Sequence, residues 1–451
     1  MITTRGVSTF QVSLMVGALV LGIVGFLMFA DVIPSPWGKS STTVEYGKTV
    51  VWGTLPQKVF SAAQGAAFSS NTQVQLVYVE KKQATFDSDL TEALANNAAP
   101  DAIIMTQESI ARQKDRLSPL GYTARDFKNA FIQEGELFLP PAGPIALPLV
   151  VDPLVMYWNR DLFARAGIVQ PPVSWTEFYS TPLTNLTVRG ASQGTLAQSA
   201  FALGEFDNIT HAKEILTTLI MQAGSPITAY TTTPAGITTI STVLAQAQSS
   251  ALQPGSAALQ FYTRFADPAR TEYSWSRALP ASVDFFAQGS LGVYFGFASD
   301  KTVIANKNPH LNFDVAPMPQ AKNDAGAPGT PATFGKMYAI GVLNAAKNVA
   351  GANYAAALLS QKEFSSSLAK EMGVASARRD VLAVQTADPY QDVFNRAALI
   401  ANGWLDPDVA GSTNAFRLAV EDVLSGRRSP NDAINVLEGR LVGLFPKQNS
   451  N

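Results

Sequence analysis

The feature that most restricts the fold is an alternation of strand-like and helix-like segments that begins near residue 49. Three short runs of apolar and β-branched residues are typical of strands: 49–52, 74–79 and 102–105. The segments between them, Leu55–Phe68 and Phe86–Asn96, have apolar side chains at helical spacing, and Asp87 or Asp89 is placed to cap the second helix. Strands that alternate with helices form a parallel sheet with helices on its faces, so we predict an α/β fold.

In a sheet of this kind, the loops at the carboxyl ends of the strands form the ligand crevice. This rule puts Gly53–Leu55 and Thr106–Glu108 on one rim and makes Thr54, Gln107 and Glu108 candidate contacts. Taken singly, each of these residues is as compatible with an ordinary loop as with a binding site.

The remaining chain is predicted from the same patterns. Residues 145–159 are nearly all apolar around one carboxylate, Asp152, which either caps its neighbours at a strand end or faces a site as an acceptor. We expect helices over 197–203 and 211–223, a helix followed by a strand over 283–297, a strand over 337–342 and three helices after residue 391. Residues 227–253, rich in Thr, Ser and Ala, fit neither pattern clearly.

Composition excludes several classes of protein. Of the 451 residues, 47% are hydrophobic and 15% charged, which favours a large core over disorder. Cysteine is absent, which excludes disulfides, thiolate metal sites, cysteine nucleophiles and a lipidated cysteine anchor. His211 and His310 are the only histidines, so a three-histidine zinc site is excluded, and we expect no metal and no cofactor. The net charge of -2, without a basic patch, argues against a nucleic-acid partner.

An uncharged apolar run, Phe10–Ala30, is long enough to cross a bilayer as a helix. Arg5 precedes it, which puts the N-terminus in the cytoplasm and the remaining chain outside. The alternative is a cleaved signal peptide, but Met28–Ala30 lacks the small-x-small cleavage pattern. We therefore predict an anchor over residues 1–30 and a flexible tether rich in Pro, Ser and Thr over residues 31–47.

At this point the chain resembles a known family, the bacterial extracellular solute-binding proteins of the maltose-binding type. The likeness spans roughly residues 49–444 and is carried by four segments: 50–56, 86–108, 147–178, and 285–300 with 313–320. In the third of them, the run YWNRDLFARAGI followed by SWTEF is fairly specific in combination.

The resemblance implies a two-lobed periplasmic-binding-protein fold that crosses between lobes three times, near 149–152, 333–338 and 383–388. The lobes implied are an N-lobe of 48–150 with 339–384 and a C-lobe of 151–338 with 385–451. The cleft between them would hold a small solute, with a carbohydrate as our prediction, because sugar rings stack on aromatic side chains and their hydroxyls pair with polar groups. The resemblance also implies a monomer without catalysis that docks on the permease subunits of an ABC importer.

The ligand contacts predicted from strand ends and from the resemblance form one set: Trp52, Thr54, Gln107, Glu108, Asp152, Asn208, Phe295, Phe297, Tyr338, Trp404 and Asn414. The resemblance aligns Asp152 and Glu108 with acidic sugar contacts, and it aligns Met105 with a stacking tryptophan that this chain lacks. For every aromatic member of the set, packing in the core is the alternative interpretation.

Two other functions stay open at this stage. A binding module of this kind can serve a membrane sensor or an adhesin instead of a transporter. Gly190–Gly194 fits the G-x-S-x-G pattern of serine hydrolases, with Ser192 as nucleophile and two histidines downstream, so a membrane-anchored hydrolase is the third hypothesis. Gly329–Lys336 departs from a phosphate-binding loop, because five residues separate its glycines and Met337 replaces the required Ser or Thr.

Overall fold

A mixed β-sheet runs through the part of the chain that the computed structural model describes, which is residues 45–68, 71, 73–191, 195–232, 236, 238–244, 253–322 and 329–445. The sheet has eleven strands within these ranges, eight of them in the order β2-β1-β3-β11-β4-β9-β6-β5. The bounds of these eight are β1 Gly47–Gly53, β2 Val74–Glu80, β3 Ala102–Thr106, β4 Leu147–Asn159, β5 Val188–Arg189, β6 Leu196–Phe201, β9 Leu291–Phe297 and β11 Thr333–Val342. The other three are β10 Phe313–Ala316 and β12 Ala375–Ser376, which pair with β4, and β13 Ala401–Asn402, which pairs with β11.

The opening of the chain folds as its alternating pattern predicts. β1 pairs in parallel with both β2 and β3, and the connecting helices are α2 Gln57–Phe68 and α3 Phe86–Ala95. Phe60 of α2 is fully buried and stacks on Tyr78 of β2 at 4.0 Å between ring centroids. This packing buries the apolar stripe of the helix against the sheet, which stabilises it more than helix propensity alone.

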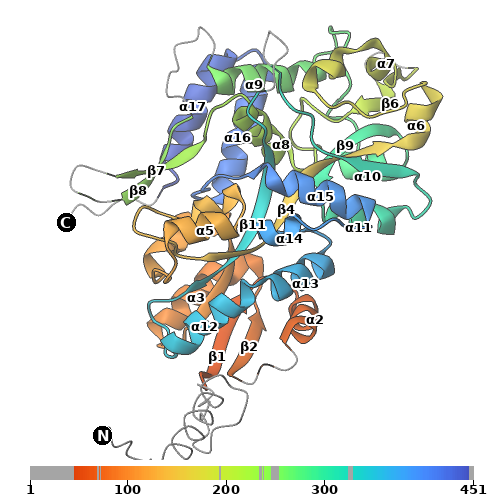
Figure 1. Cartoon of the computed structure of the whole chain (residues 1–451). Coiled ribbons are helices and arrows are strands. Elements are labelled where there is room, and N and C mark those ends of the chain that lie inside the picture. The colour runs from red at the N-terminus through yellow and green to blue at the C-terminus, as the bar shows by residue number, and fades with distance from the viewer. Residues whose placement is uncertain are drawn as a thin grey trace, which may run out of the picture. The chain divides into compact units, whose positions relative to one another are not determined.

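Two long strands join the halves of the sheet (Figure 1). β4 pairs with β11 as far as Pro153 and with β9 from Leu154 onward, so it changes partner in the middle of one strand. β11 behaves in the same way, because Phe334 pairs with β13 whereas the residues from Gly335 onward pair with β4. The first half of the sheet therefore comprises β2, β1, β3 and β11, and the second half comprises β9, β6 and β5.

Helices cover both halves of the sheet. Those that follow β3 as far as β6 are short: α4 Ile110–Gln113, α5 Ala124–Ala130, α6 Arg160–Arg165 and α7 Thr181–Thr184. The helices after β6 are α8 Ala212–Gln222, α9 Pro254–Thr263, α10 Ser282–Ala287, α11 Asp300–Lys307, α12 Val349–Leu359, α13 Lys362–Met372, α14 Arg379–Leu382, α15 Pro389–Leu399, α16 Val409–Leu424 and α17 Pro430–Val442. A separate hairpin, β7 Thr228–Thr232 with β8 Thr238–Thr242, occupies the stretch whose pattern fitted neither class.

The predicted helix over 197–203 is wrong, because these residues form strand β6. Ser199 and Phe201 pair in parallel with β9, which places the strand inside the sheet. Its sequence, Leu-Ala-Gln-Ser-Ala-Phe, has the small residues of a helix, but pairing with a buried neighbour outweighs that propensity.

The predicted cap of α3 is also wrong. Thr85 occupies the N-cap position without a side-chain hydrogen bond. Asp87 instead accepts hydrogen bonds from Arg112 Nε at 2.7 Å and from Gln113 Nε2 at 2.7 Å. The carboxylate thereby ties α3 to α4, and Asp89 accepts from Lys81 Nζ at 3.5 Å.

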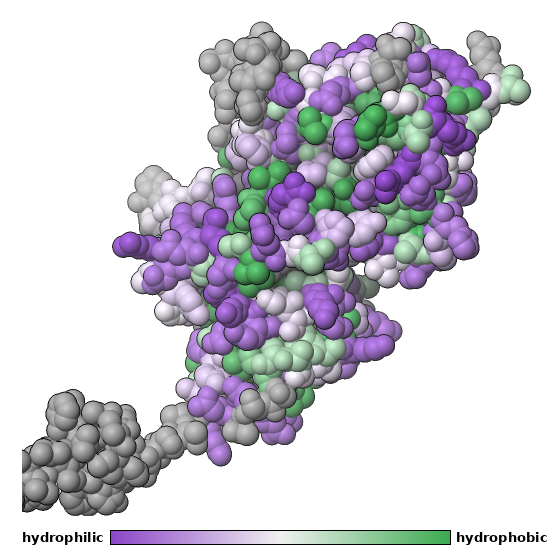
Figure 2. Space-filling view, turned by 45° about the vertical axis from the view of Figure 1, so that its right-hand side comes forward, coloured by the Kyte–Doolittle hydropathy of each residue, from purple (hydrophilic) through white to green (hydrophobic). Residues whose placement is uncertain are grey.

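Figure 2 shows that the visible face is mainly hydrophilic, with smaller groups of hydrophobic residues among the polar ones. The large hydrophobic side chains with the highest exposure among the described residues are Val169, Val173 and Val384. Within the ranges described above, no helix has both the length and the hydropathy of a membrane span. The predicted span over residues 10–30 and most of the tether lie outside those ranges.

Candidate ligand-binding cleft

A cavity of about 820 Å³ lies at the rim where β1 and β3 end. Thr54 follows β1 and Glu108 follows β3, and both line the cavity, as do Lys336 and Tyr338 of β11. The first turns of α16 supply Thr413 from the other side. The rim predicted from the carboxyl ends of the strands therefore borders an open space of the size of a small-molecule site.

The carboxylate of Glu108 and the ammonium of Lys336 lie beside each other in the lining of this cavity. Their Oε2 and Nζ atoms are 3.8 Å apart, and the side chains are 11% and 36% exposed. Burial alone lowers the pKa of Lys336, but Glu108 and other acidic groups nearby raise its pKa above the ordinary value, so the amine is charged. The pair thus brings one full negative and one full positive charge to the wall of the cavity.

Asp152 lies on β4 directly opposite Lys336 in the strand register. Its carboxylate does not line the cavity, because it accepts hydrogen bonds from the backbone N–H of Ser299 at 3.1 Å and from its hydroxyl at 2.6 Å. Burial raises the pKa of Asp152 to about 6, although the bonds from Ser299 act in the opposite direction. Both carboxylate oxygens of Asp152 are thus engaged by Ser299, which lies 147 residues further along the chain, rather than by its neighbours at a strand end.

Gln107 is fully buried and is bound to the backbone of β11. Its Nε2 donates to the carbonyl oxygen of Gly335 at 2.8 Å, and its Oε1 accepts from the N–H of Met337 at 2.9 Å. Both ends of the amide are occupied, so we set Gln107 aside as a ligand contact. The sequence placed it correctly beside the rim but could not show the direction of its side chain.

Three predicted stacking residues are part of the core. Phe295 is 1% exposed and packs against Trp175 at 5.5 Å between centroids. Phe297 is 7% exposed and packs edge-on against His211 at 4.7 Å. Trp404 is 2% exposed, beside Phe416. These rings have little surface left for a ligand, so the alternative interpretation, core packing, describes all three.

Of the other aromatic candidates, Tyr338 lines the cavity and Trp52 does not. Trp52 is half-buried, and the ammonium of Lys81 lies 3.8 Å from the centre of its ring. The lining of the cavity is therefore mixed: charged and polar side chains alternate with apolar ones, among them the half-buried Tyr338, the buried Phe86, and Met105, where the resemblance expects tryptophan.

Asn208 is a structural residue in this fold. Its Nδ2 donates to the carbonyl oxygens of Ser276 at 2.9 Å and Leu279 at 3.0 Å, and its Oδ1 accepts from Trp275 Nε1 at 3.0 Å. Because the amide has no unused donor or acceptor pointing to a cavity, we set it aside as a contact as well.

A second, smaller cavity of about 420 Å³ adjoins the first, since Ala410 and Thr413 line both. Asn414, the last predicted contact, lies here, and its Oδ1 accepts from Arg417 at 2.7 Å. His211 also lines this space and hydrogen-bonds Asp300 at 2.9 Å. Burial alone lowers the pKa of His211, but the bond and charge of Asp300 raise its pKa above the ordinary value.

A buried ion pair fixes the start of α16 beside the cavities. Lys213 Nζ of α8 lies 3.0 Å from Asp406 Oδ2, and the two side chains are 3% and 1% exposed. The hydroxyl of Ser412 donates to the same carboxylate at 2.6 Å. These contacts hold the loop before α16 against α8 next to Thr413, and Lys213 itself lines the smaller cavity.

Glu134 is an unusual group behind the cleft, in the 3₁₀ helix Gln133–Phe138. It is 1% exposed, and neither carboxyl oxygen has a hydrogen-bond partner among the described residues. The carboxyl group lies against Gly335 of β11 and Gly403, where an added Cβ would overlap it. Burial raises the pKa of Glu134 to about 8, so the group is mainly protonated at neutral pH.

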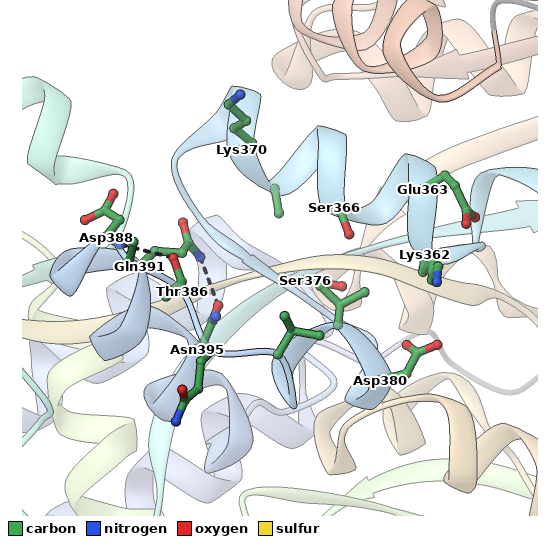
Figure 3. Close-up of a pocket in the computed structure, with 15 residues that line it drawn as sticks. Lys362, Glu363, Ser366, Lys370, Ser376, Asp380, Thr386, Asp388, Gln391 and Asn395 are labelled. Atoms are coloured by element: carbon green, nitrogen blue, oxygen red, sulfur yellow. Dashed lines mark hydrogen bonds between the residues drawn. The ribbon is translucent and has the colours of Figure 1, made fainter.

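Another cavity, of about 780 Å³, lies between α13, α14 and α15 (Figure 3). Part of its polar lining is engaged with the protein: Asp380 pairs with Arg378 at 2.8 Å, and Gln391 donates to Asn395 at 2.9 Å. Asp388 caps α15. We place the candidate site in the first cavity, because it lies at the ends of β1 and β3 and because the Glu108 carboxylate and the Lys336 ammonium have no hydrogen bond in the described part of the chain.

Lys336 was missed by the sequence-based reasoning, although a signal was present. It is the one charged residue in the run Thr333–Val342, and it stands two positions from Tyr338, so both side chains point to the same face of the strand. The reasoning that singled out Asp152 in its apolar run applies equally to this lysine.

The serine-hydrolase hypothesis depends on Ser192 and the two histidines, and only the histidines are among the described residues. Ser192 lies outside them, so the G-x-S-x-G hypothesis is not tested by its geometry. His211 is paired with Asp300, and His310 is exposed.

The chain is similar to known proteins in its family pattern, its sequence and its structure. A family model described as bacterial extracellular solute-binding protein matches residues 53–362. A protein of Brucella abortus (strain 2308) named as a candidate binding protein is 38% identical over 79 residues, and a protein of Brucella suis biovar 1 (strain 1330) matches equally. These matches span 17% of the chain and 17% of each relative.

Solved structures share the fold over most of the chain. A cyclo/maltodextrin-binding protein complexed with maltotetraose has a TM-score of 0.69 at 16% identity, covering 89% of this chain and 98% of that one. A cyclic alpha-maltosyl-1,6-maltose binding protein from Arthrobacter globiformis has a TM-score of 0.68 at 16% identity, and the match covers 88% of this chain and 98% of that one. The GacH receptor of Streptomyces glaucescens GLA.O has a TM-score of 0.62 at 17% identity, and the match covers 88% of this chain and 98% of that one. The described fold is therefore the two-lobed α/β fold of these proteins.

Proposed function

This chain belongs to the bacterial extracellular solute-binding proteins, and on that premise we propose that it captures a carbohydrate in the cleft beside Glu108 and Lys336 and delivers it to an ABC importer. Proteins of this family are binding proteins rather than enzymes, so recognition without turnover is the activity to be explained. The observation that carries the proposal is the family match over residues 53–362, together with a cavity at the rim of its sheet whose lining includes a carboxylate and an ammonium.

The ligand class is supported by the structural neighbours and by the chemistry of the cleft. The neighbours are named for maltotetraose, a cyclic maltosyl-maltose and acarbose, all of them carbohydrates or carbohydrate-like molecules. The cavity offers a carboxylate, an ammonium and a tyrosine, which suit the hydroxyls and the apolar face of a sugar ring. Its volume of about 820 Å³ leaves room for more than one sugar unit.

We further propose that the lobes are residues 48–150 with 339–384 and residues 151–338 with 385–451. The partner changes of β4 near Pro153 and of β11 near Gly335 support two of the crossings. Thr54 and Glu108 line the cavity from the first lobe and Thr413 from the second, so a ligand that touches all three would favour the closed form.

The proposal extends to the membrane side of the molecule. Residues 10–30 would anchor the chain, residues 31–47 would tether the lobes outside the cytoplasmic membrane, and the permease subunits would receive the loaded protein as a monomer. Crosslinking in cells that express the chain together with the permease subunits of an ABC importer tests this step. Capture of a sensor kinase instead of a permease would contradict delivery to an importer.

Thermal-shift measurements on the purified full-length chain test the ligand class. The detergent must have no sugar headgroup, because a maltoside would compete for the cleft. We expect stabilisation by maltotriose or maltotetraose and none by amino acids, peptides or polyamines, with roughly 2.7 kcal/mol gained at a ligand concentration of 100 times Kd. Stabilisation by a non-sugar class alone would keep the receptor and refute the carbohydrate.

A further inference from the structure

Lys336 occupies an exceptional position on β11. Over the ten residues Thr333–Val342, only Lys336 and Tyr338 are partly exposed, and the other eight are buried. The two alternate with buried residues, so their side chains lie on one face of the strand, and both line the cavity. Placing a charged lysine in a strand of otherwise apolar residues costs desolvation free energy, so we expect its charge to have a function.

The hydrogen-bonding capacity of the Glu108–Lys336 pair is unused. At 3.8 Å the two charged atoms attract each other without forming a hydrogen bond, and no other described group bonds to either of them. Lys336 therefore retains three N–H donors and Glu108 retains the acceptor sites of its carboxylate. Both sets of unused sites border the same cavity.

The other cation of the cavity is already committed. Arg112 donates from Nε to Asp87 at 2.7 Å and from Nη1 to the carbonyl oxygens of Glu108 at 3.0 Å and Pro407 at 3.2 Å. Asp408 adds a further acidic side chain to the lining. Lys336 is thus a donor with a carboxylate at its side, in a cavity without excess positive charge.

We propose that Lys336 is a specificity-determining residue of the cleft: with Glu108 it forms a donor–acceptor clamp for two adjacent hydroxyl groups of a neutral sugar. The ammonium donates to one hydroxyl oxygen while the carboxylate accepts from the neighbouring hydroxyl, and each bond is strengthened by a full charge. The clamp disfavours phosphorylated or carboxylated sugars, because their anionic group would lie beside Glu108. The inference rests on the proposed function, since it names the ligand class within the same cleft.

Competition calorimetry on the full-length chain tests the clamp, with bound maltotriose displaced by glucose, glucuronate or glucose 6-phosphate. We expect glucose to displace maltotriose at least ten-fold more effectively than either anion. Lys336→Met should weaken maltotriose binding about ten-fold or more, and Lys336→Arg should recover part of the loss. The double variant Glu108→Gln with Lys336→Met should lose less affinity for maltotriose than the product of the two single fold-losses. The reason is that both residues bind the same pair of hydroxyl groups.

A matched control is the exposed pair Lys128 and Glu136, whose Nζ and Oε2 are 2.6 Å apart and which does not line the cavity. Lys128→Met and Glu136→Gln should leave binding unchanged, and circular dichroism checks that every variant folds. Tighter binding of an anion than of glucose, or a Lys336→Met affinity within two-fold of the parent, would overturn the clamp while leaving a carbohydrate receptor. Failure of the parent chain to bind any sugar would refute the proposed function and the clamp with it.

Discussion

The buried carboxyl of Glu134 makes the stability of this fold depend on pH in a direction that can be worked out. Its pKa is about 8 in the folded chain against 4.5 for the ordinary side chain. Because the folded pKa is raised, the contribution of this group is fully present below pH 4.5 and is lost as the pH rises through 8. At about 1.4 kcal/mol per unit, the free energy of unfolding falls by roughly 5 kcal/mol across that interval.

Glu134→Gln removes this titration and keeps the shape of the side chain. The amide stays neutral but brings two buried N–H donors without a partner where the protonated carboxyl brings one O–H, and the additional unpaired donor costs about 1–3 kcal/mol. We therefore expect the variant to be less stable than the parent near pH 5 and more stable near pH 8.5, so that the two stability curves cross.

Urea unfolding followed by fluorescence at pH 5, 7 and 8.5 measures the difference between the two chains. The matched control is Glu136→Gln, in the same 3₁₀ helix, because the Glu136 side chain is 40% exposed and paired with Lys128. The control substitution should change the free energy of unfolding by the same amount at all three pH values. Parallel curves for Glu134→Gln and the parent would refute the reasoning, since they would mean that Glu134 is not the group that titrates.

Three further predictions concern packing around the cleft. Gly335→Ala should lower the free energy of unfolding by about 1–3 kcal/mol in urea titrations, because its Cβ would overlap the carboxyl of Glu134, and Glu134→Ala in the same chain should restore part of the loss. Lys213→Met should cost about 3–5 kcal/mol in the same assay, because it leaves Asp406 buried and unpaired; a cost below 1 kcal/mol would contradict the buried pair. Phe295→Ala should lower the free energy of unfolding by about 3–5 kcal/mol, and calorimetry should show unchanged selectivity among sugars. A change in selectivity would mean that Phe295 contacts the ligand.

Local patterns were sufficient to predict the first half of the sheet. The strands and helices of residues 47–106 have strong composition signals and short connections, so neighbouring segments in the sequence are neighbours in space. The same reasoning predicted the rim at Thr54 and Glu108, both of which line the cavity. Strand β6 could not be predicted in this way, because its partner β9 lies about 90 residues further along the chain.

The direction of side chains set the limit on predicting the site. A fully buried strand such as β9 has apolar residues on both faces, so its sequence does not show whether Phe295 or Phe297 faces a cleft. Asp152 and Lys336 are opposite each other in the sheet and both interrupt apolar runs, yet the cavity is lined by the lysine and not by the aspartate. The Ser299 backbone and hydroxyl that satisfy Asp152 lie far away in the sequence, which is why the pattern alone left both interpretations of it open.

The central claim is that a carbohydrate binds in the cavity beside Glu108 and Lys336, and calorimetric titration of maltotriose into the parent chain and into Thr413→Trp tests it most directly. Thr413 lines both adjoining cavities, so the indole would fill the space that the ligand needs. We predict binding of one maltotriose by the parent and a loss of at least 100-fold in the variant. Equal affinity in the two chains would contradict the claim and place the ligand elsewhere, with the cavity between α13, α14 and α15 as the next candidate.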